Sequence, residues 1–278
     1  MTTTGSGVVA SADMLKCSCA AVWAHPAARL LFGDALHPGG RELTAALVDR
    51  CELASSDRVL DVGSGTGVTL AVLRERGMRA IGVDYSATLA DLAADSASVT
   101  VGDAELLPLA TGAFDAVVVE CVLSTLPDKD AAVAEMRRVL RSGGRFAMSD
   151  VLVTGPLPDP LDSLLGWMAC TAGALGRTGY KDLVESRGFE VVEVFEHPSA
   201  VRTLVAKARR RVALLHAAAR VGVVPGAEEL IGADLAMVVS AVAGAGNLDA
   251  LAQRVLSQAA AAVDDGVLSY TSLVALAD

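Results

Sequence analysis

The chain has 278 residues, and its 23 Lys and Arg against 33 Asp and Glu give a formal net charge of −10 at pH 7. This acidic balance disfavours a nucleic acid as partner, because binding to a phosphate backbone depends on clustered basic side chains. Apolar residues make up 53% of the sequence. They suffice for one large core or two modest ones, which excludes disorder over most of the chain.

The sequence pattern predicts neither a membrane span nor an export signal. The longest apolar stretches, at 164–176 and 235–248, are shorter than the roughly 18 residues that a membrane-spanning helix needs. Residues 1–12 lack the basic start and the apolar stretch of a secretory signal. Five cysteines, an odd number, suit free thiols in a reducing compartment. We therefore expect a cytoplasmic protein with no membrane partner.

The N-terminal part predicts a flexible tail at 1–13 and a helical lid at 14–54. The lid is broken at 37–40, where two glycines after a proline end one helix and allow another to begin. From residue 58 short apolar runs alternate with longer amphipathic ones, which is typical of βαβ units and a parallel sheet. Strands are predicted at 58–62, 79–83, 98–101, 114–120, 145–151 and 189–195, and helices at 68–76, 86–94, 129–140 and 178–187.

The C-terminal part predicts a helical insertion at 198–265, interrupted at 223–226 and 244–247, and a last strand within 266–278. Since strands that would pair with each other flank the insertion, we expect it to pack on the sheet as a cap and the last strand to run antiparallel. The predicted fold is α/β, with a doubly wound, mostly parallel seven-stranded sheet whose main domain spans 55–197.

A glycine-rich turn follows the first predicted strand, where residues 59–67 read Val-Leu-Asp-Val-Gly-Ser-Gly-Thr-Gly. Glycines at alternate positions let the backbone approach a ligand at the carboxyl end of the strand, and the next helix offers free N–H groups. Gly67 comes two residues after Gly65, whereas the dinucleotide fingerprint needs three. The turn therefore predicts a nucleotide-type cradle without a pyrophosphate site.

Acidic residues follow the next two strands. Asp84 is placed to accept hydrogen bonds from both ribose hydroxyls of an adenosine, and Asp103 would lie near an adenine amino group. A strand with a glycine turn, followed by two strands that each end at an acidic residue, resembles the class I S-adenosylmethionine-dependent methyltransferases over 58–150. The resemblance implies a Rossmann-like fold, S-adenosylmethionine as cofactor, and these cofactor-binding residues: Asp61, Gly63, Gly65, Gly67, Asp84, Tyr85, Asp103, Ala104 and Glu120. The alternative is that the glycines only turn the chain and the acids cap helices.

A narrower resemblance lies after the fourth and fifth strands. The run Glu-Cys-Val-Leu-Ser-Thr-Leu-Pro-Asp-Lys at 120–129 and the run Cys-Thr-Ala-Gly-Ala-Leu at 170–175 resemble the arsenic-binding stretches of arsenite methyltransferases. That resemblance implies that Cys121 and Cys170 are catalytic residues that hold trivalent arsenic. Arsenic(III) prefers thiolate ligands, as soft metals do, and its lone pair can attack a sulfonium methyl without a general base. The enzyme then contributes mainly positioning.

The sequence also departs from that family. Glu120 and Ser124 stand where the family has asparagine, and the N-terminal cysteines are spaced differently. Cys17 and Cys19 either supply further thiolates to the metalloid or are an exposed pair without function. Cys51 is expected to be a buried filler.

Three functions stay open at this point. The first is methyl transfer to arsenite or a related metalloid. The second is methyl transfer to an O, N or S atom of another small molecule, with Glu120 as general base and the cysteines as filler. The third is a non-catalytic protein that binds the cofactor or a metalloid. His37, in the break of the lid, is the histidine best placed for a catalytic role.

Overall fold

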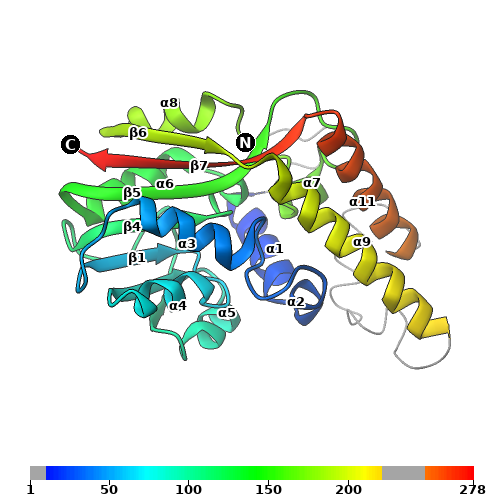
Figure 1. The fold of residues 1–278 in the computed structure, drawn as a ribbon, viewed down its shortest axis with the longest axis horizontal. Coiled ribbons are helices and arrows are strands. Elements are labelled where there is room, and N and C mark those ends of the chain that lie inside the picture. Colours follow the sequence, from blue (N-terminus) through cyan, green and yellow to red (C-terminus); the bar gives the residue numbers. More distant parts are fainter. Residues whose placement is uncertain (1–10, 221–247) are drawn as a thin grey trace.

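The computed structural model describes residues 11–220 and 248–278. Its centre is a seven-stranded sheet in the order β3-β2-β1-β4-β5-β7-β6, seen along the left of Figure 1. The strands are β1 (Arg58–Val62), β2 (Arg79–Asp84), β3 (Ser98–Val101), β4 (Phe114–Glu120), β5 (Leu140–Val153), β6 (Phe189–Glu196) and β7 (Leu268–Ala277).

Strand β7 runs antiparallel to both of its neighbours, β5 and β6. The other paired strands, from β3 across to β5, are parallel. These pairings confirm the predicted sheet with its antiparallel last strand. Strand β5 begins earlier than predicted, because Leu140 pairs with Phe114 across an irregularity in the ladder, although Gly143 and Gly144 favour a turn there.

The helices over the sheet lie close to their predicted positions. Within the N-terminal region, the first helix begins inside the stretch predicted as a tail, because Ser11 caps it by accepting from the Met14 N–H. The predicted interruptions at 223–226 and 244–247 lie outside the described residues, as do residues 1–10 of the predicted tail. The helices are α1 (Ala12–Ala24), α2 (Pro26–Phe32), α3 (Gly40–Arg50), α4 (Val68–Glu75), α5 (Ala87–Ala93), the 3₁₀ helix η1 (Leu123–Thr125), α6 (Lys129–Val139), α7 (Leu164–Met168), α8 (Gly179–Glu185), α9 (Pro198–Arg220) and α11 (Leu248–Asp264).

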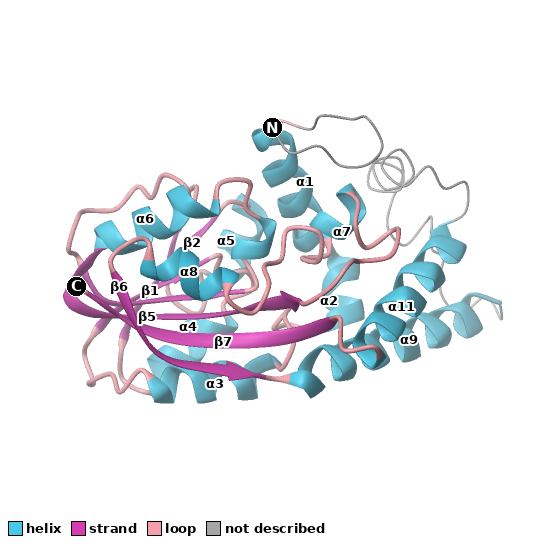
Figure 2. Cartoon of the chain, turned by 90° about the horizontal axis from the view of Figure 1, so that it is seen from above, coloured by secondary structure: helices cyan, strands magenta, loops and turns pink. Residues whose placement is uncertain are grey.

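Apolar cores lie on both faces of the sheet. Met136 of α6 and Val184 of α8 belong to the core on one face, while Leu47 of α3 and Leu73 of α4 belong to the core on the other. Figure 2 shows the corresponding helices on opposite sides of the strands. Two covered faces explain why the central strands read as nearly continuous apolar runs.

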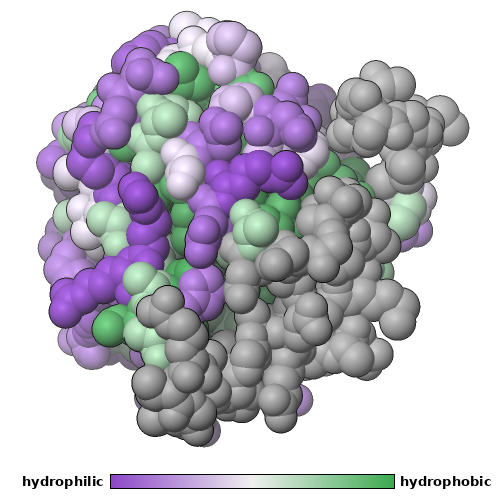
Figure 3. All heavy atoms as spheres, turned by 90° about the vertical axis from the view of Figure 1, so that its right-hand side faces the viewer, coloured by the Kyte–Doolittle hydropathy of each residue, from purple (hydrophilic) through white to green (hydrophobic). Residues whose placement is uncertain are grey.

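Helix α9 is hydrogen-bonded to the C-terminal end of α2. Lys207 of α9 donates to the Phe32 carbonyl at 3.0 Å, and Arg211 donates to the Leu30 carbonyl at 3.0 Å. Basic side chains thus satisfy the free carbonyls at the C-terminus of α2. On this side of the molecule hydrophilic side chains cover much of the described surface (Figure 3). None of the helices within 11–220 and 248–278 has the length and apolar character that crossing a bilayer requires.

Candidate active site

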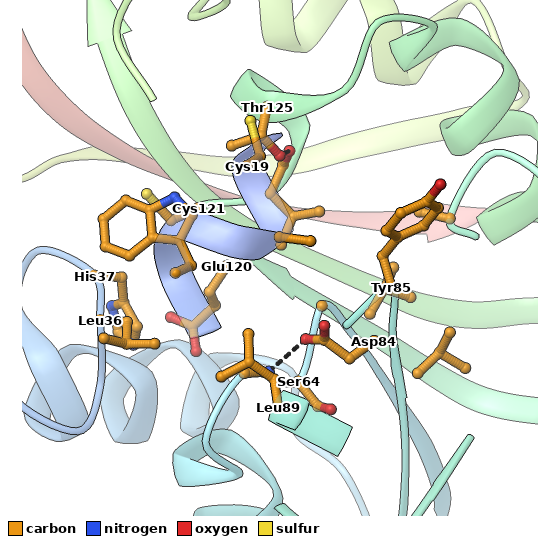
Figure 4. A pocket seen from close by; sticks show the side chains of 18 of the residues that line it. Cys19, Leu36, His37, Ser64, Asp84, Tyr85, Leu89, Glu120, Cys121 and Thr125 are labelled. Atoms are coloured by element: carbon orange, nitrogen blue, oxygen red, sulfur yellow. Dashed lines mark hydrogen bonds between the residues drawn. The ribbon is translucent and has the colours of Figure 1, made fainter. Parts of the chain in front are cut away.

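A pocket opens at the carboxyl ends of β1, β2, β3 and β4, beneath the N-terminal helices (Figure 4). One end of it is built by the glycine turn and by the residues that follow β2 and β3. The other end is built by residues from α1, from the 33–39 connection and from the loops after β4 and α7. Ligands of open parallel sheets bind at this edge.

The glycine turn has a shape that other residues would not adopt easily. Gly63 and Gly65 have φ of +73° and +54°, in the left-handed region. A Cβ added at Gly63 would collide with the side chain of Val122. A Cβ at Gly65 would have no neighbour closer than 4.0 Å, so it would project into the pocket. The turn therefore leaves room for a ligand against its backbone.

Asp84 is fixed at the end of β2. Its carboxylate accepts the Gly65 N–H and the Ser86 N–H, each at 2.8 Å, and Figure 4 shows it pointing toward the turn. Burial raises the pKa of this carboxyl, and the two backbone hydrogen bonds oppose the rise. Since each carboxylate oxygen has a second lone pair, Asp84 can still accept from a pair of hydroxyls.

Two buried polar atoms beside the turn have no hydrogen-bond partner within the described chain. They are Oδ2 of Asp61 and Oγ of Ser64, in residues only 1% and 6% exposed. Burial, with the nearby charges of Glu120 and Asp84, raises the pKa of Asp61 well above its ordinary value. Unsatisfied buried acceptors call for a donor, and the ammonium group of S-adenosylmethionine has that chemistry. The residues present therefore fit this cofactor.

Asp103, at the expected adenine end, is already paired with a lysine. Lys16 of α1 contacts Asp103 at 2.7 Å and also pairs with Glu105. Burial lowers the pKa of Lys16, but the hydrogen bonds with the two carboxylates outweigh it and the net shift is upward. The predicted adenine-binding residue Asp103 is thus paired with the N-terminal helix, and Ala104 and Tyr85 line the pocket.

Glu120 accepts hydrogen bonds from three hydroxyl groups. Its Oε1 accepts from Thr44 at 2.8 Å and from Thr69 at 3.0 Å, and its Oε2 accepts from Ser149 at 3.0 Å. Ser149 is in turn hydrogen-bonded to the Tyr270 hydroxyl at 3.0 Å. A carboxylate held in this way is a fixed negative charge in the pocket wall and not a free base.

His37 is engaged through both ring nitrogens. Nδ1 lies 3.1 Å from the Pro38 carbonyl and Nε2 lies 3.2 Å from the Thr44 hydroxyl. Each carboxylate and imidazole among the described lining residues therefore already has a hydrogen-bond partner. This arrangement does not favour general-base catalysis by Glu120 or His37.

Three cysteines from distant parts of the chain line the opposite end of the pocket: Cys19, Cys121 and Cys170. The Cys170 thiol faces the Cys121 carbonyl oxygen at 3.9 Å. A hydrogen bond with Cys170 and burial raise the pKa of Cys121 well above its ordinary value. Burial, and then the charge of Cys170, raise the pKa of Cys19 to about 12. No group of three His, Cys, Asp or Glu side chains within the described ranges has the spacing of a formed metal site.

Two of these cysteines have an unfavourable backbone conformation. Cys121 has φ of +56° and Cys170 has φ of +61°, and a left-handed L-residue costs roughly 1–2 kcal/mol. Such strain persists where the surroundings impose it and is frequent at functional sites.

The other two cysteines lie elsewhere. Cys17 is exposed, with its sulfur 3.8 Å from the Tyr85 hydroxyl, and it does not line the pocket. Cys51 is fully buried in the core under α3. Of the two N-terminal cysteines in the predicted thiol set, Cys19 lines the pocket and Cys17 does not.

Sequence reasoning did not find several residues of the site. Lys16 and Trp23 come from α1, and Thr44 and Thr69 hold Glu120. Leu15, Lys16, Cys19 and Trp23 follow a helical spacing on one face of α1, which is the signal that could have indicated them.

A buried carboxyl lies close enough to Cys121 to affect the pKa of its thiol. Asp150 accepts from the Ser124 N–H at 2.9 Å and from the Val151 N–H at 2.7 Å. Burial raises its pKa from 3.8 to about 6, against the opposing effect of these hydrogen bonds and of Lys129. Because the folded state holds this proton more tightly than the unfolded state, ionised Asp150 destabilises the fold at neutral pH, and this cost declines as the pH falls from about 6 toward 3.8.

We expect Asp150→Asn to reveal this cost. The free energy of unfolding of the variant minus that of the wild type should decrease by about 2 kcal/mol between about pH 7.5 and about pH 4.5, because only the wild type gains stability on protonation. Urea unfolding at several pH values measures the difference, and subtraction cancels the other titrating groups. A difference that stays constant with pH would show that Asp150 has an ordinary pKa.

Comparison with known proteins relates part of the chain to methyltransferases. Residues 60–148 match the family described as "Methyltransferase domain". The methyltransferase GfsG of Streptomyces halstedii is 32% identical over 174 residues, which cover 58% of this chain and 63% of GfsG. The arsenite methyltransferase of Halobacterium salinarum is 34% identical over 157 residues, which cover 51% of this chain and 39% of that enzyme. The chain thus matches less than two thirds of either relative.

Two solved structures share the fold along nearly the whole chain. The [4+2]-cyclase SpnF superposes with a TM-score of 0.68 at 21% identity and covers 99% of both chains. Phosphoethanolamine N-methyltransferase 2 of Haemonchus contortus, in complex with S-adenosyl-L-methionine, gives a TM-score of 0.71 at 18% identity and covers 98% of this chain and 60% of that one. At such identities the likeness concerns the fold alone.

The sheet order is that of the class I S-adenosylmethionine-dependent methyltransferase fold, and residues 60–148 match a methyltransferase domain. The residues of the pocket fit S-adenosylmethionine as cofactor. Within that class the chain resembles the arsenite methyltransferases and also other small-molecule methyltransferases.

Proposed function

We propose that the protein transfers a methyl group from S-adenosylmethionine to a thiol-bound trivalent metalloid, with arsenite as the acceptor. The observation that supports this acceptor is the convergence of three cysteines on the pocket end where the oxygen and nitrogen bases are already hydrogen-bonded. An acceptor that needs no deprotonation suits such a site. A reducing, cytoplasmic location would keep these thiols free.

The cysteines are the acceptor-binding residues in this proposal. Each thiol replaces one hydroxide of arsenous acid, so that a sulfur–arsenic bond forms and the thiol proton leaves in a molecule of water. This exchange needs no separate base, which agrees with the elevated pKa of Cys19 and Cys121. The arsenic keeps its lone pair as the nucleophile, and the pocket supplies the alignment.

The cofactor residues occupy the other end of the same pocket. S-adenosylmethionine, when bound, supplies the electrophilic methyl group. Asp84 would hold the ribose hydroxyls, and Asp61 would accept from the ammonium group. Asp103 and Ala104 would contact the adenine, while Glu120 contributes a fixed negative charge to the wall.

Methyl transfer to an apolar small molecule is the second candidate. The pocket wall also contains Trp23, Leu36, Val122 and Leu126, and an apolar wall suits an aromatic or isoprenoid acceptor. The demethylmenaquinone methyltransferase of Thermobifida fusca is 36% identical over 46% of this chain. In this case the cysteines would be filler and their alkylation would leave turnover intact.

A direct assay separates the candidates. The full chain is incubated with methyl-labelled S-adenosylmethionine and, in parallel, with arsenite, selenite, a small thiol or a quinol. We expect label in methylated arsenic. Arsenite should also protect Cys121 and Cys170 from iodoacetamide, while the exposed Cys17 is alkylated with or without arsenite. Label found only in the quinol or the thiol would overturn the metalloid acceptor.

A further inference from the structure

Trp167 connects the two loops that carry the left-handed cysteines. Its indole N–H donates to the Thr125 carbonyl at 2.8 Å, in the loop that begins at Cys121. Its own carbonyl accepts the Cys170 N–H at 3.0 Å. One residue of α7 is therefore hydrogen-bonded to both segments, although 49 positions separate the two cysteines.

The loop that begins at Cys121 is otherwise anchored to β5 (Leu140–Val153). The Cys121 N–H donates to the Ser149 carbonyl at 2.7 Å, and the Ser124 N–H donates to Asp150 at 2.9 Å. These bonds fix the first loop to β5 but do not fix its distance from Cys170.

The two loops also touch without a side chain between them. A Cβ at Gly173 would collide with the Ser124 carbonyl oxygen. The absence of a side chain at Gly173 therefore allows the contact, and the Trp167 hydrogen bonds hold it in one geometry.

Trp167 is well placed for such a role. It is 6% exposed, packs in a cluster with Met168 and Cys19, and does not line the pocket. A buried tryptophan N–H needs a partner, and here that partner lies on the loop of the opposite cysteine.

We propose that Trp167 is a positioning residue that sets the spacing of the Cys121 and Cys170 thiols, so that the pair binds one trivalent arsenical as a chelating dithiol. This inference rests on the proposed function, because it assigns to the two thiols a common ligand. A residue that only filled the core would affect stability without affecting chelation.

The test uses phenylarsine oxide, which condenses with two thiols to form two arsenic–sulfur bonds and one water. The starting protein is the full chain with Cys17→Ser and Cys19→Ser, which leaves Cys121 and Cys170 as the thiols that line the pocket, while Cys51 is fully buried in the core under α3. Trp167→Phe keeps an aromatic ring and removes the N–H. We expect its dissociation constant for phenylarsine oxide to rise by at least about tenfold, as the effective concentration of the second thiol falls.

The alkylation rates of the single thiols with iodoacetamide should stay unchanged, because a monothiol reaction does not require the spacing. Tyr180→Phe is the matched control. It also removes one buried donor to a backbone carbonyl, that of Val151 at 3.0 Å, and should leave the affinity for phenylarsine oxide unchanged.

Gly173→Ala is an independent variant, because its added methyl group would push the same two loops apart. If Trp167→Phe does not fold, this variant tests whether chelation depends on the spacing of the two loops. We expect it also to weaken chelation. Retention of full affinity in Gly173→Ala and in any folded Trp167→Phe would overturn the role of Trp167 and leave the proposed function intact. Absence of phenylarsine oxide binding in the starting protein would overturn the dithiol itself, and the proposed function with it.

Discussion

Cys121→Ser and Cys170→Ser are each expected to lower the rate of arsenite methylation by at least about 100-fold, since arsenic that is held through fewer sulfurs loses its alignment with the methyl group. Serine has nearly the same size but offers a hard, poorly ionised oxygen in place of a soft sulfur. The affinity for S-adenosylmethionine should not change, because the cofactor end of the pocket is built by other residues. Product formation from labelled donor and calorimetric titration of the donor measure the two quantities separately.

Cys17→Ser is the control for this result. Cys17 is exposed and lies outside the pocket, so the variant should turn over at the wild-type rate. Undiminished turnover in both Cys121→Ser and Cys170→Ser would leave the thiols without a catalytic role.

Asp84→Ala is expected to weaken the binding of S-adenosylmethionine by about 1.5–3 kcal/mol for each charged hydrogen bond that is lost to the ribose. Asp84→Asn should lose less, because it keeps an acceptor for one of the two backbone N–H groups. Calorimetry gives the affinities, and circular dichroism checks that the variants are folded. Asp91→Ala, an exposed acid on α5, is the matched control, and equal affinities for wild type and Asp84→Ala would remove Asp84 from the cofactor site.

The sequence predicted the sheet well because local patterns coincide with the strands. The apolar runs at 58–62 and 114–120 are bounded by turn residues, and both agree with the observed β1 and β4. Strand β5 was predicted too short, because its first residues pair across an irregularity that depends on the neighbouring strand. Pairing of this kind is a tertiary effect that local propensity does not contain.

The cofactor end of the site could also be predicted, since strand ends in a parallel sheet meet at one edge. At the acceptor end, the choice between Cys17 and Cys19 could not be predicted. Cys17 and Cys19 lie two positions apart on a helix and so point in nearly opposite directions. Only the start and packing of α1 decide which of them enters the pocket. The pairing of Lys16 with Asp103 spans 87 positions, and no spacing rule in the sequence indicates it.

The position of β7 determines when the sheet can be completed during synthesis of the chain. This strand comes after all the other elements in the sequence, yet it lies between β5 and β6. Tyr270 of β7 contacts Ser149, which in turn donates to Glu120 in the pocket wall. While β7 is still inside the ribosome, β5 is an edge strand whose backbone groups on that side lack hydrogen-bond partners. The pocket wall is therefore completed only after β7 has been synthesised and has inserted between β5 and β6.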